Sequence, residues 1–246
     1  MSTHTAPKRA SGSHAPGTTV YERYLRTDEL LRLQKSEEER LHPDELLFQV
    51  VHQTCELWWK VTIQQLRAAG DWLQSGQAAE AAVALRRAVA HQVLVQDVLR
   101  QLEYLSPVDF LTIRTGLGDG SGGDSPGFRA VLRAAPVLWS AFAAALERAG
   151  ATLEMVYERR AEYPAWHECA EALVDFDERF HLFRAQHLKL AQRNLGMHAV
   201  GTGGTQMSDL DKTLRFLLFP DLWKARDALL AHWLERQSSV NGATGA

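Results

Sequence analysis

Apolar residues recur every three or four positions along most of the chain, which is the period of an α-helix. A first short helix is predicted over residues 21–34. It is followed by a long one over residues 44–73, whose apolar side chains cover nearly its whole circumference. A helix that is apolar all round is expected at the centre of a fold. Further helices are predicted over residues 77–104, 107–114, 128–148, 151–163 and 169–195, and on each side of Pro220. Alternating runs of β-branched residues, which are typical of strands, are nearly absent, so the predicted fold class is all-α.

Local signals mark the ends of some of these helices. Ser106 has the features of an N-cap, because Pro107 occupies the first turn and Asp109 follows three residues later. Gly196 is placed to end the helix that carries residues 169–195. Two glycine-rich loops, residues 116–127 and 201–205, separate helical segments.

Composition narrows the class of protein. The chain has 246 residues, of which 46% are hydrophobic, and we expect one domain over residues 20–236. Residues 1–19 and 237–246 are polar and are predicted to be disordered tails. The formal net charge is −3 and the chain has no run of basic residues, so we expect neither nucleic acid nor an anionic membrane as a partner. The expected partner is a small molecule.

Cysteine content and the length of the apolar runs bear on the compartment. The chain contains two cysteines, which fits a reducing cytoplasm and excludes a disulfide framework. The longest apolar run, residues 134–146, falls short of the roughly 20 residues that span a bilayer. We therefore expect a soluble, cytoplasmic protein.

The first glycine-rich loop resembles two well-known motifs, but its context excludes both. Gly118, Gly120 and Gly123 have dinucleotide-fingerprint spacing, yet a helix precedes them where that motif requires a strand. Ser125 stands between glycines as in a nucleophile elbow. The next residue is Pro126, which has no N–H to donate to an oxyanion. Neither a dinucleotide-binding enzyme nor a serine hydrolase is predicted.

Two histidines lie on apolar helical faces. His52, in the stretch HQTCELWWK, follows Phe48 by four residues, and His187 follows Phe183 by four. The commoner interpretation of each is a core histidine hydrogen-bonded to a neighbour. The alternative is haem, because a metal bound through a single protein nitrogen needs a macrocycle to supply its other ligands. A dedicated zinc or non-haem iron site is less well supported, because His187 has no histidine partner four residues away.

Five stretches of the chain carry a family resemblance. They read YERYLRTDELLRLQ, HPDELLFQVVHQTCELWWK, SPVDFLTIRTGLG, FRAQHLKLAQRNLGMHAVGTGGT and LLFPDLWKAR. In order and in residue type they resemble the tryptophan 2,3-dioxygenase family of histidine-ligated haem enzymes, from Tyr21 to Arg226. The resemblance implies an all-α haem-binding bundle and a cytoplasmic enzyme of tryptophan catabolism in the kynurenine pathway. Such an enzyme cleaves the C2–C3 bond of the indole ring of L-tryptophan with O2, giving N-formylkynurenine.

The resemblance also implies roles for individual residues. Haem b would be held by His187, the iron ligand, with Ser121 and Gly122 as further cofactor contacts. On the substrate side it implies that His52 lies near the indole N–H as the catalytic residue. It places Phe48 and Phe110 along the substrate and Arg114 on its carboxylate. Thr202 would bind the ammonium group. A homotetramer is implied, in which an N-terminal helix bearing Tyr21, Tyr24 and Leu25 enters the neighbouring subunit's pocket.

Some positions depart from the family pattern. Residues are missing between about 134 and 174, Phe110 stands where some members have tyrosine, and Gly-Gly-Asp-Ser at 122–125 replaces Gly-Phe-Gln-Ser. These changes lie in or beside the pocket walls. They support an alternative, a related haem enzyme that oxygenates a modified tryptophan in natural-product biosynthesis and inserts one oxygen atom instead of two. A third hypothesis is a haem-binding or purely structural helical protein.

Overall fold

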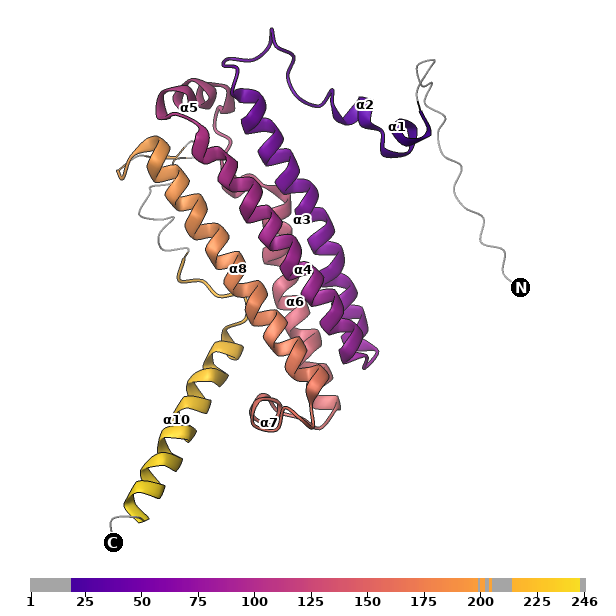
Figure 1. Ribbon diagram of the computed structural model, residues 1–246, viewed down its shortest axis with the longest axis vertical. Helices are drawn as coiled ribbons and strands as arrows, with labels where there is room; N and C mark the ends of the chain where they lie inside the picture. The colour runs from indigo at the N-terminus through magenta and orange to yellow at the C-terminus, as the bar shows by residue number, and fades with distance from the viewer. Residues whose placement is uncertain (1–18, 199, 202–203, 205–213, 244–246) are drawn as a thin grey trace, which may run out of the picture.

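A computed structural model describes residues 19–198, 200, 201, 204 and 214–243. Four long helices lie side by side and form the body of the molecule (Figure 1). They are α3 (Glu45–Gln74), α4 (Ala78–Leu99), α6 (Pro126–Arg148) and α8 (Pro164–Leu195). α3 packs against α4 and α6, and α4 packs against α8. Apart from a single β-bridge residue, Val200, the described residues form helices, turns and loops, so the all-α prediction is confirmed.

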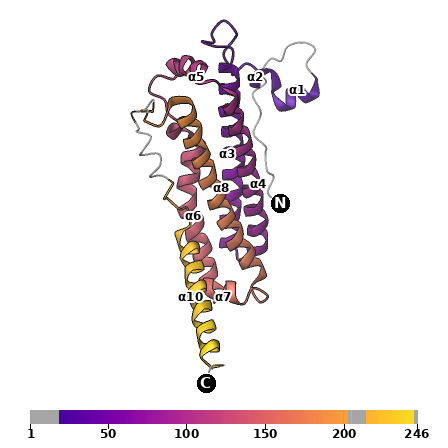
Figure 2. The same cartoon turned by 60° about the vertical axis from the view of Figure 1, so that its left-hand side comes forward.

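Shorter elements cover the two ends of the bundle. One end carries the 3-10 helix η1 (Arg100–Tyr104), α5 (Pro107–Arg114), and the short 3-10 turns η2 (Thr115–Leu117) and η3 (Gly122–Asp124). The opposite end carries α7 (Leu153–Glu158) (Figure 1). α1 (Val20–Leu25) and α2 (Thr27–Leu30) project from the body near the first end, and α10 (Pro220–Ala243) extends past the second (Figure 2).

Side-chain caps explain several helix boundaries. The hydroxyl of Ser106 accepts a hydrogen bond from the N–H of Asp109 at 3.2 Å, as the sequence predicted. Gly196 ends α8 with a φ of 90°, which only glycine adopts readily. α6 begins earlier than predicted, because Ser125 accepts a hydrogen bond from the N–H of Phe128 at 3.1 Å.

Other predicted boundaries are wrong. The single helix over residues 21–34 is replaced by α1 and α2, because Arg26 between them adopts a left-handed φ of 57°. The helix expected over 151–163 is the six-residue α7, and α8 starts at Pro164, ahead of the predicted residue 169. Before Pro220, residues 214–219 form turns and coil, and residues 205–213 lie outside the described part. α10 continues to Ala243, so the segment after residue 236 is largely helical instead of a disordered tail. Residues 1–18 and 244–246 lie outside the described part.

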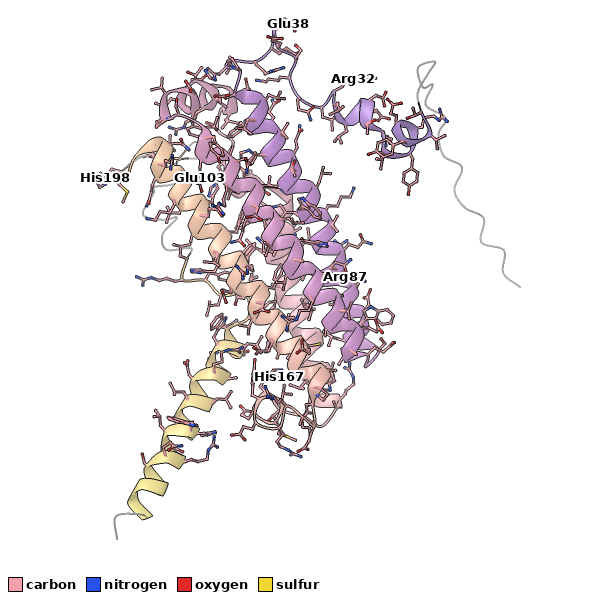
Figure 3. The ribbon with its side chains drawn as sticks, in the orientation of Figure 1. Arg32, Glu38, Arg87, Glu103, His167 and His198 are labelled. Atoms are coloured by element: carbon pink, nitrogen blue, oxygen red, sulfur yellow. The ribbon has the colours of Figure 1, made fainter. Side chains whose placement is uncertain are left out.

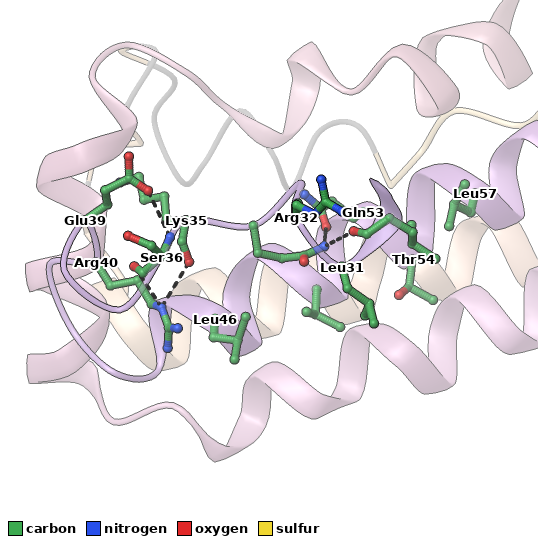
Figure 4. A pocket seen from close by; sticks show the side chains of 13 residues that line it. Leu31, Arg32, Lys35, Ser36, Glu39, Arg40, Leu46, Gln53, Thr54 and Leu57 are labelled. Atoms are coloured by element: carbon green, nitrogen blue, oxygen red, sulfur yellow. Dashed lines mark hydrogen bonds between the residues drawn. The ribbon is translucent and has the colours of Figure 1, made fainter. Parts of the chain in front are cut away.

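The helix α3, which the sequence predicted at the centre of the fold, is instead an outer helix that packs against α4, α6 and η1 and leaves one face exposed. Its inner face buries Val51, Trp59 and Leu66 in the core. Its outer face contributes Val50 and Leu57 to a groove of about 670 Å³, whose other wall is the chain segment 30–40 (Figure 4). Both residues are exposed in the single chain.

α6 is long and apolar enough to cross a membrane by length and composition. Its apolar side chains Val131, Leu138 and Phe142 are buried against the rest of the bundle. These residues form one buried face of α6, and 33% of its most apolar stretch is buried in all.

Candidate active site

His52 lies on the inner face of α3 and its hydrogen bond defines its tautomer. Its Nδ1 is 2.7 Å from the carbonyl oxygen of Phe48, one turn earlier. A carbonyl only accepts hydrogen bonds, so Nδ1 carries the proton and donates it. Burial lowers the pKa of His52, against smaller opposing effects from this hydrogen bond and from the charge of Glu56. The ring is therefore neutral near pH 7, and its Nε2 lone pair can accept a hydrogen bond.

Aromatic rings from α3 and α5 meet beside this imidazole. The ring centroids of Phe48 and His52 are 4.1 Å apart, and those of Phe48 and Phe110 are 6.1 Å apart. Arg114, one turn after Phe110 on α5, donates a hydrogen bond from Nη2 to the carbonyl oxygen of Val200 at 2.7 Å. An apolar wall and a guanidinium thus lie next to each other, which suits a ligand with a flat apolar ring and a carboxylate.

A second imidazole, that of His187, comes from α8. Burial lowers its pKa, and repulsion from His52 when that ring is protonated lowers it further, so the two rings are close enough to affect each other's titration. Phe183 stacks near His187 with a centroid distance of 6.4 Å, and Trp59 meets Phe183 edge-on at 5.3 Å. His187 is therefore a neutral imidazole that packs against Phe183, which in turn contacts Trp59 in the core.

The glycine-rich turn η3 lies close to Nε2 of His187. A Cβ built on Gly122 would be 2.8 Å from Nε2 of that ring, which is closer than real Cβ atoms approach. A larger residue at this position would force the ring of His187 to shift. Within the turn, Asp124 Oδ2 accepts hydrogen bonds from the N–H and the hydroxyl of Ser121, both at 3.0 Å.

Comparison with known proteins shows the family to which the chain belongs. The sequence model of the tryptophan 2,3-dioxygenase family matches residues 1–134 and 142–229. The chain belongs to the tryptophan 2,3-dioxygenase family. The proteins named tryptophan 2,3-dioxygenase from Arthrobacter sp. and Myxococcus xanthus are each 30% identical to it. The alignments cover 84% and 87% of this chain and 90% of each relative. The one from Caulobacter vibrioides is 31% identical over 85% of this chain and 98% of its own length.

The family implies a haem cofactor, and the residues present fit one. His187 is a buried neutral imidazole, and such a ring offers one unprotonated nitrogen of the kind that haem iron takes as a ligand. Gly122 leaves no side chain against Nε2 of His187. His52 supplies a second imidazole close by without itself being charged.

A second cluster of metal-ligand types is explained without an ion. His42, Asp44 and Asp109 lie close together at the start of α3 and α5. Nδ1 of His42 accepts the N–H of Asp44 at 3.3 Å, which assigns the proton to Nε2, 3.5 Å from an oxygen of Asp109. His42 therefore links the two segments through a hydrogen bond from Asp44 and a close contact with the carboxylate of Asp109.

The structure brings together most of the residues singled out from the tryptophan 2,3-dioxygenase resemblance. Those at or beside the site are Phe48, His52, Phe110, Arg114, Ser121, Gly122 and His187. Tyr21, Tyr24 and Leu25 lie on α1, away from this site and exposed. Thr202 lies outside the described residues. Of the other histidines on or near α8, His167 and His198 are at its opposite ends (Figure 3).

Sequence reasoning missed Glu56. Its carboxylate accepts hydrogen bonds from the hydroxyl of Ser125 and from the N–H of Gly127, the latter at 2.9 Å. The available signal was its spacing, since an acidic residue four positions after His52 shares that histidine's face on an otherwise apolar helix.

Proposed function

We propose that this chain is a haem-dependent tryptophan 2,3-dioxygenase. It uses O2 to cleave the C2–C3 bond of the indole ring of L-tryptophan, giving N-formylkynurenine. The observation that carries the proposal is the family match, which extends over the helices α3, α5 and α8 that hold the site. Its relatives bear the name of this activity over 84% or more of the chain.

In this proposal His187 holds haem b through Nε2, and Ser121 and Gly122 belong to the turn next to the cofactor. When bound, haem supplies the iron that binds and activates O2. The residues of the chain keep this ligand neutral by burying it, so its lone pair is available at neutral pH.

The remaining residues orient the substrate. Nε2 of His52 accepts a hydrogen bond from the indole N–H, because the proton of this ring is already committed to the carbonyl of Phe48. Phe48 and Phe110 form the apolar walls for the indole ring. Arg114 pairs with the carboxylate and Thr202 with the ammonium group. Holding the ring in one orientation with water excluded accounts for much of the expected acceleration.

A homotetramer in which α1 enters the pocket of a neighbouring subunit completes the proposal. Tyr21 and Tyr24 are 69% and 77% exposed in the single chain, on a helix that leaves the body (Figure 2). An exposed apolar helix of this kind is expected to be buried elsewhere. We also propose that the enzyme is cytoplasmic and has neither nucleic acid nor a membrane as a partner.

One experiment tests the activity. The purified protein is reconstituted with haem, reduced, and incubated with L-tryptophan and O2, and the products are identified by mass spectrometry. N-formylkynurenine is expected, and a His187→Ala variant should neither retain haem nor form the product. Turnover restricted to a methylated tryptophan, with gain of one oxygen atom, would overturn the proposal in favour of a modified-tryptophan oxygenase. A protein that does not bind haem at all would also overturn it.

A further inference from the structure

A carboxylate on α3 is bonded to the start of α6. Glu56 uses both of its oxygens there, one for the hydroxyl of Ser125 and one for the N–H of Gly127 at 2.9 Å. Ser125 is itself the N-cap of α6 and accepts the N–H of Phe128 at 3.1 Å. A negative charge at a helix N-terminus that accepts free N–H groups makes a strong, well-directed contact.

Close packing also holds the start of α6 against α3, in addition to the hydrogen bonds of Glu56. A Cβ built on Gly127 would lie 2.4 Å from Cβ of Trp59, one turn along α3 from Glu56. The first turn of α6 therefore rests directly on the side chain of Trp59, with no room for a side chain on Gly127. Since Trp59 is 1% exposed and held by core rings, this contact has little freedom to shift.

The turn that precedes this anchor reaches His187. Gly122 lies against Nε2 of His187, three residues before Ser125. Between them Asp124 bonds back to Ser121 and pairs with Arg129 on α6, and Nε of Arg129 donates to the carbonyl of Gly123 at 2.8 Å. The segment from Ser121 to Gly127 is thus a short, internally bonded unit with one end fixed to α3 and the other against the imidazole.

We propose that Glu56 is a positioning residue that sets how closely the Ser121–Asp124 turn lies over His187, and so how firmly the cofactor site is closed. The inference rests on the proposed function, because it concerns the same histidine as haem ligand. Glu56 acts through the turn, and its loss should loosen the turn while leaving the helices in place.

The test compares Glu56→Ala with Glu56→Gln. Alanine removes both contacts, whereas the glutamine amide can accept the N–H of Gly127 and donate to the hydroxyl of Ser125. Haem dissociation is measured by transfer to excess haem-free myoglobin, followed by the change in Soret absorbance. We expect about tenfold faster dissociation for Glu56→Ala, with a clearly smaller change for Glu56→Gln. Equal effects of the two variants would attribute the change to the lost charge. That result would overturn the proposal that the hydrogen bonds of Glu56 hold the turn in place.

Two variants of Ser125, which donates its hydroxyl to Glu56, test the same contact from the other side, and a variant of Thr152 serves as a control. Ser125→Ala should also speed dissociation, and Ser125→Thr should restore it, because threonine keeps the hydroxyl. Thr152→Ala removes the N-cap of α7, which accepts the N–H of Met155 at 3.3 Å at the far end of the bundle. The Thr152→Ala variant should be less stable than the parent but should release haem at the same rate. If Thr152→Ala speeds dissociation as much as Ser125→Ala, general destabilisation explains the effect and the proposal fails.

Hydrogen exchange on the haem-free protein gives a readout that does not depend on the cofactor. Amides of residues 121–128 should exchange faster in Glu56→Ala than in the parent, while amides in the centre of α4 are unchanged. A parent protein that fails to bind haem would refute the proposed function. Hydrogen exchange would then still test whether Glu56 holds the turn in place. A parent that binds haem, with Glu56→Ala binding it equally firmly and exchanging equally slowly, would refute the anchor alone.

Discussion

Replacing Gly127 by alanine should destabilise the protein through one defined collision. The new Cβ would lie 2.4 Å from Cβ, 2.6 Å from Cγ and 2.7 Å from Cδ1 of Trp59. Carbon atoms in favourable contact are about 3.5–4.0 Å apart, so α3 and α6 would have to separate by roughly 1 Å. Trp59 cannot turn aside, because Phe180 and Phe183 meet it edge-on with centroids 5.9 Å and 5.3 Å away.

The magnitude follows from this geometry, and the chain offers a matched control. Overpacking a well-ordered core costs about 1–3 kcal/mol, so Gly127→Ala should lower the free energy of unfolding by about that amount. Gly70 lies inside α3 with no heavy atom within 4 Å of a built Cβ. Gly70→Ala should therefore raise the free energy of unfolding by about 0.5–1 kcal/mol, as expected for a helix interior. The same chemical change thus has opposite signs at two positions near one pair of helices.

Urea unfolding of the haem-free proteins, followed by far-ultraviolet circular dichroism, measures both effects. All variants are compared at one protein concentration, because assembly would otherwise shift the midpoint. The slope of the transition should be unchanged and the midpoint should move in opposite directions for the two variants. Equal midpoints for Gly127→Ala and the parent would show that α6 can move away from Trp59 freely, and would refute the close-packing argument.

Three further predictions concern charge. Arg114→Ala should raise KM for tryptophan in steady-state assays by the equivalent of about 2–5 kcal/mol, because it leaves the substrate carboxylate unpaired, and an unchanged KM would refute its role. The pKa values of His52 and His187 are lowered by burial, so the stability that they contribute is present above about pH 6.5 and is lost as pH falls below it. Haem-free protein unfolded in urea at pH 7.5 and pH 5.5 should show this loss, and variants with both histidines replaced by glutamine should show less of it. Burial raises the pKa of Glu45, but its hydrogen bonds and the charge of Lys35 have the larger combined effect, so the pKa lies below its usual value. Lys35→Met should therefore cost about 1–2 kcal/mol in urea unfolding at pH 7, with the difference from the parent vanishing as pH falls well below 4.5.

The helices were predictable because each buries a face whose period the sequence displays. α3 was predicted over residues 44–73 and spans Glu45–Gln74, and α8 ends at Gly196 as predicted. The errors occur where the backbone, not the hydrophobic pattern, decides. The break at Arg26 depends on a left-handed residue that is neither glycine nor asparagine, and no local signal in the sequence indicates it.

The site divides in the same way. Local spacing placed Phe48 and His52 on one face of α3, and Phe110 and Arg114 on one face of α5. Periodicity alone could not pair His52 with His187, because their meeting depends on how α3 and α8 pack, and only the family resemblance brought them together. Glu56 was missed for a related reason, since its partners belong to a loop whose path no periodic pattern describes.

The exposed side of α3 connects these observations with assembly. A helix that is apolar all round is expected to be covered on every side, yet Leu57 is 50% exposed and Val50 and Leu46 lie beside it. The tyrosines of α1 are exposed on a helix that contacts α2 and otherwise leaves the body. Both surfaces are apolar, and burying either one contributes about 25 cal/mol for each Å² removed from water. The apolar pattern that predicted a central α3 is therefore not satisfied within the single chain, and the outer face of α3 is a surface that a neighbouring subunit of the proposed homotetramer would bury.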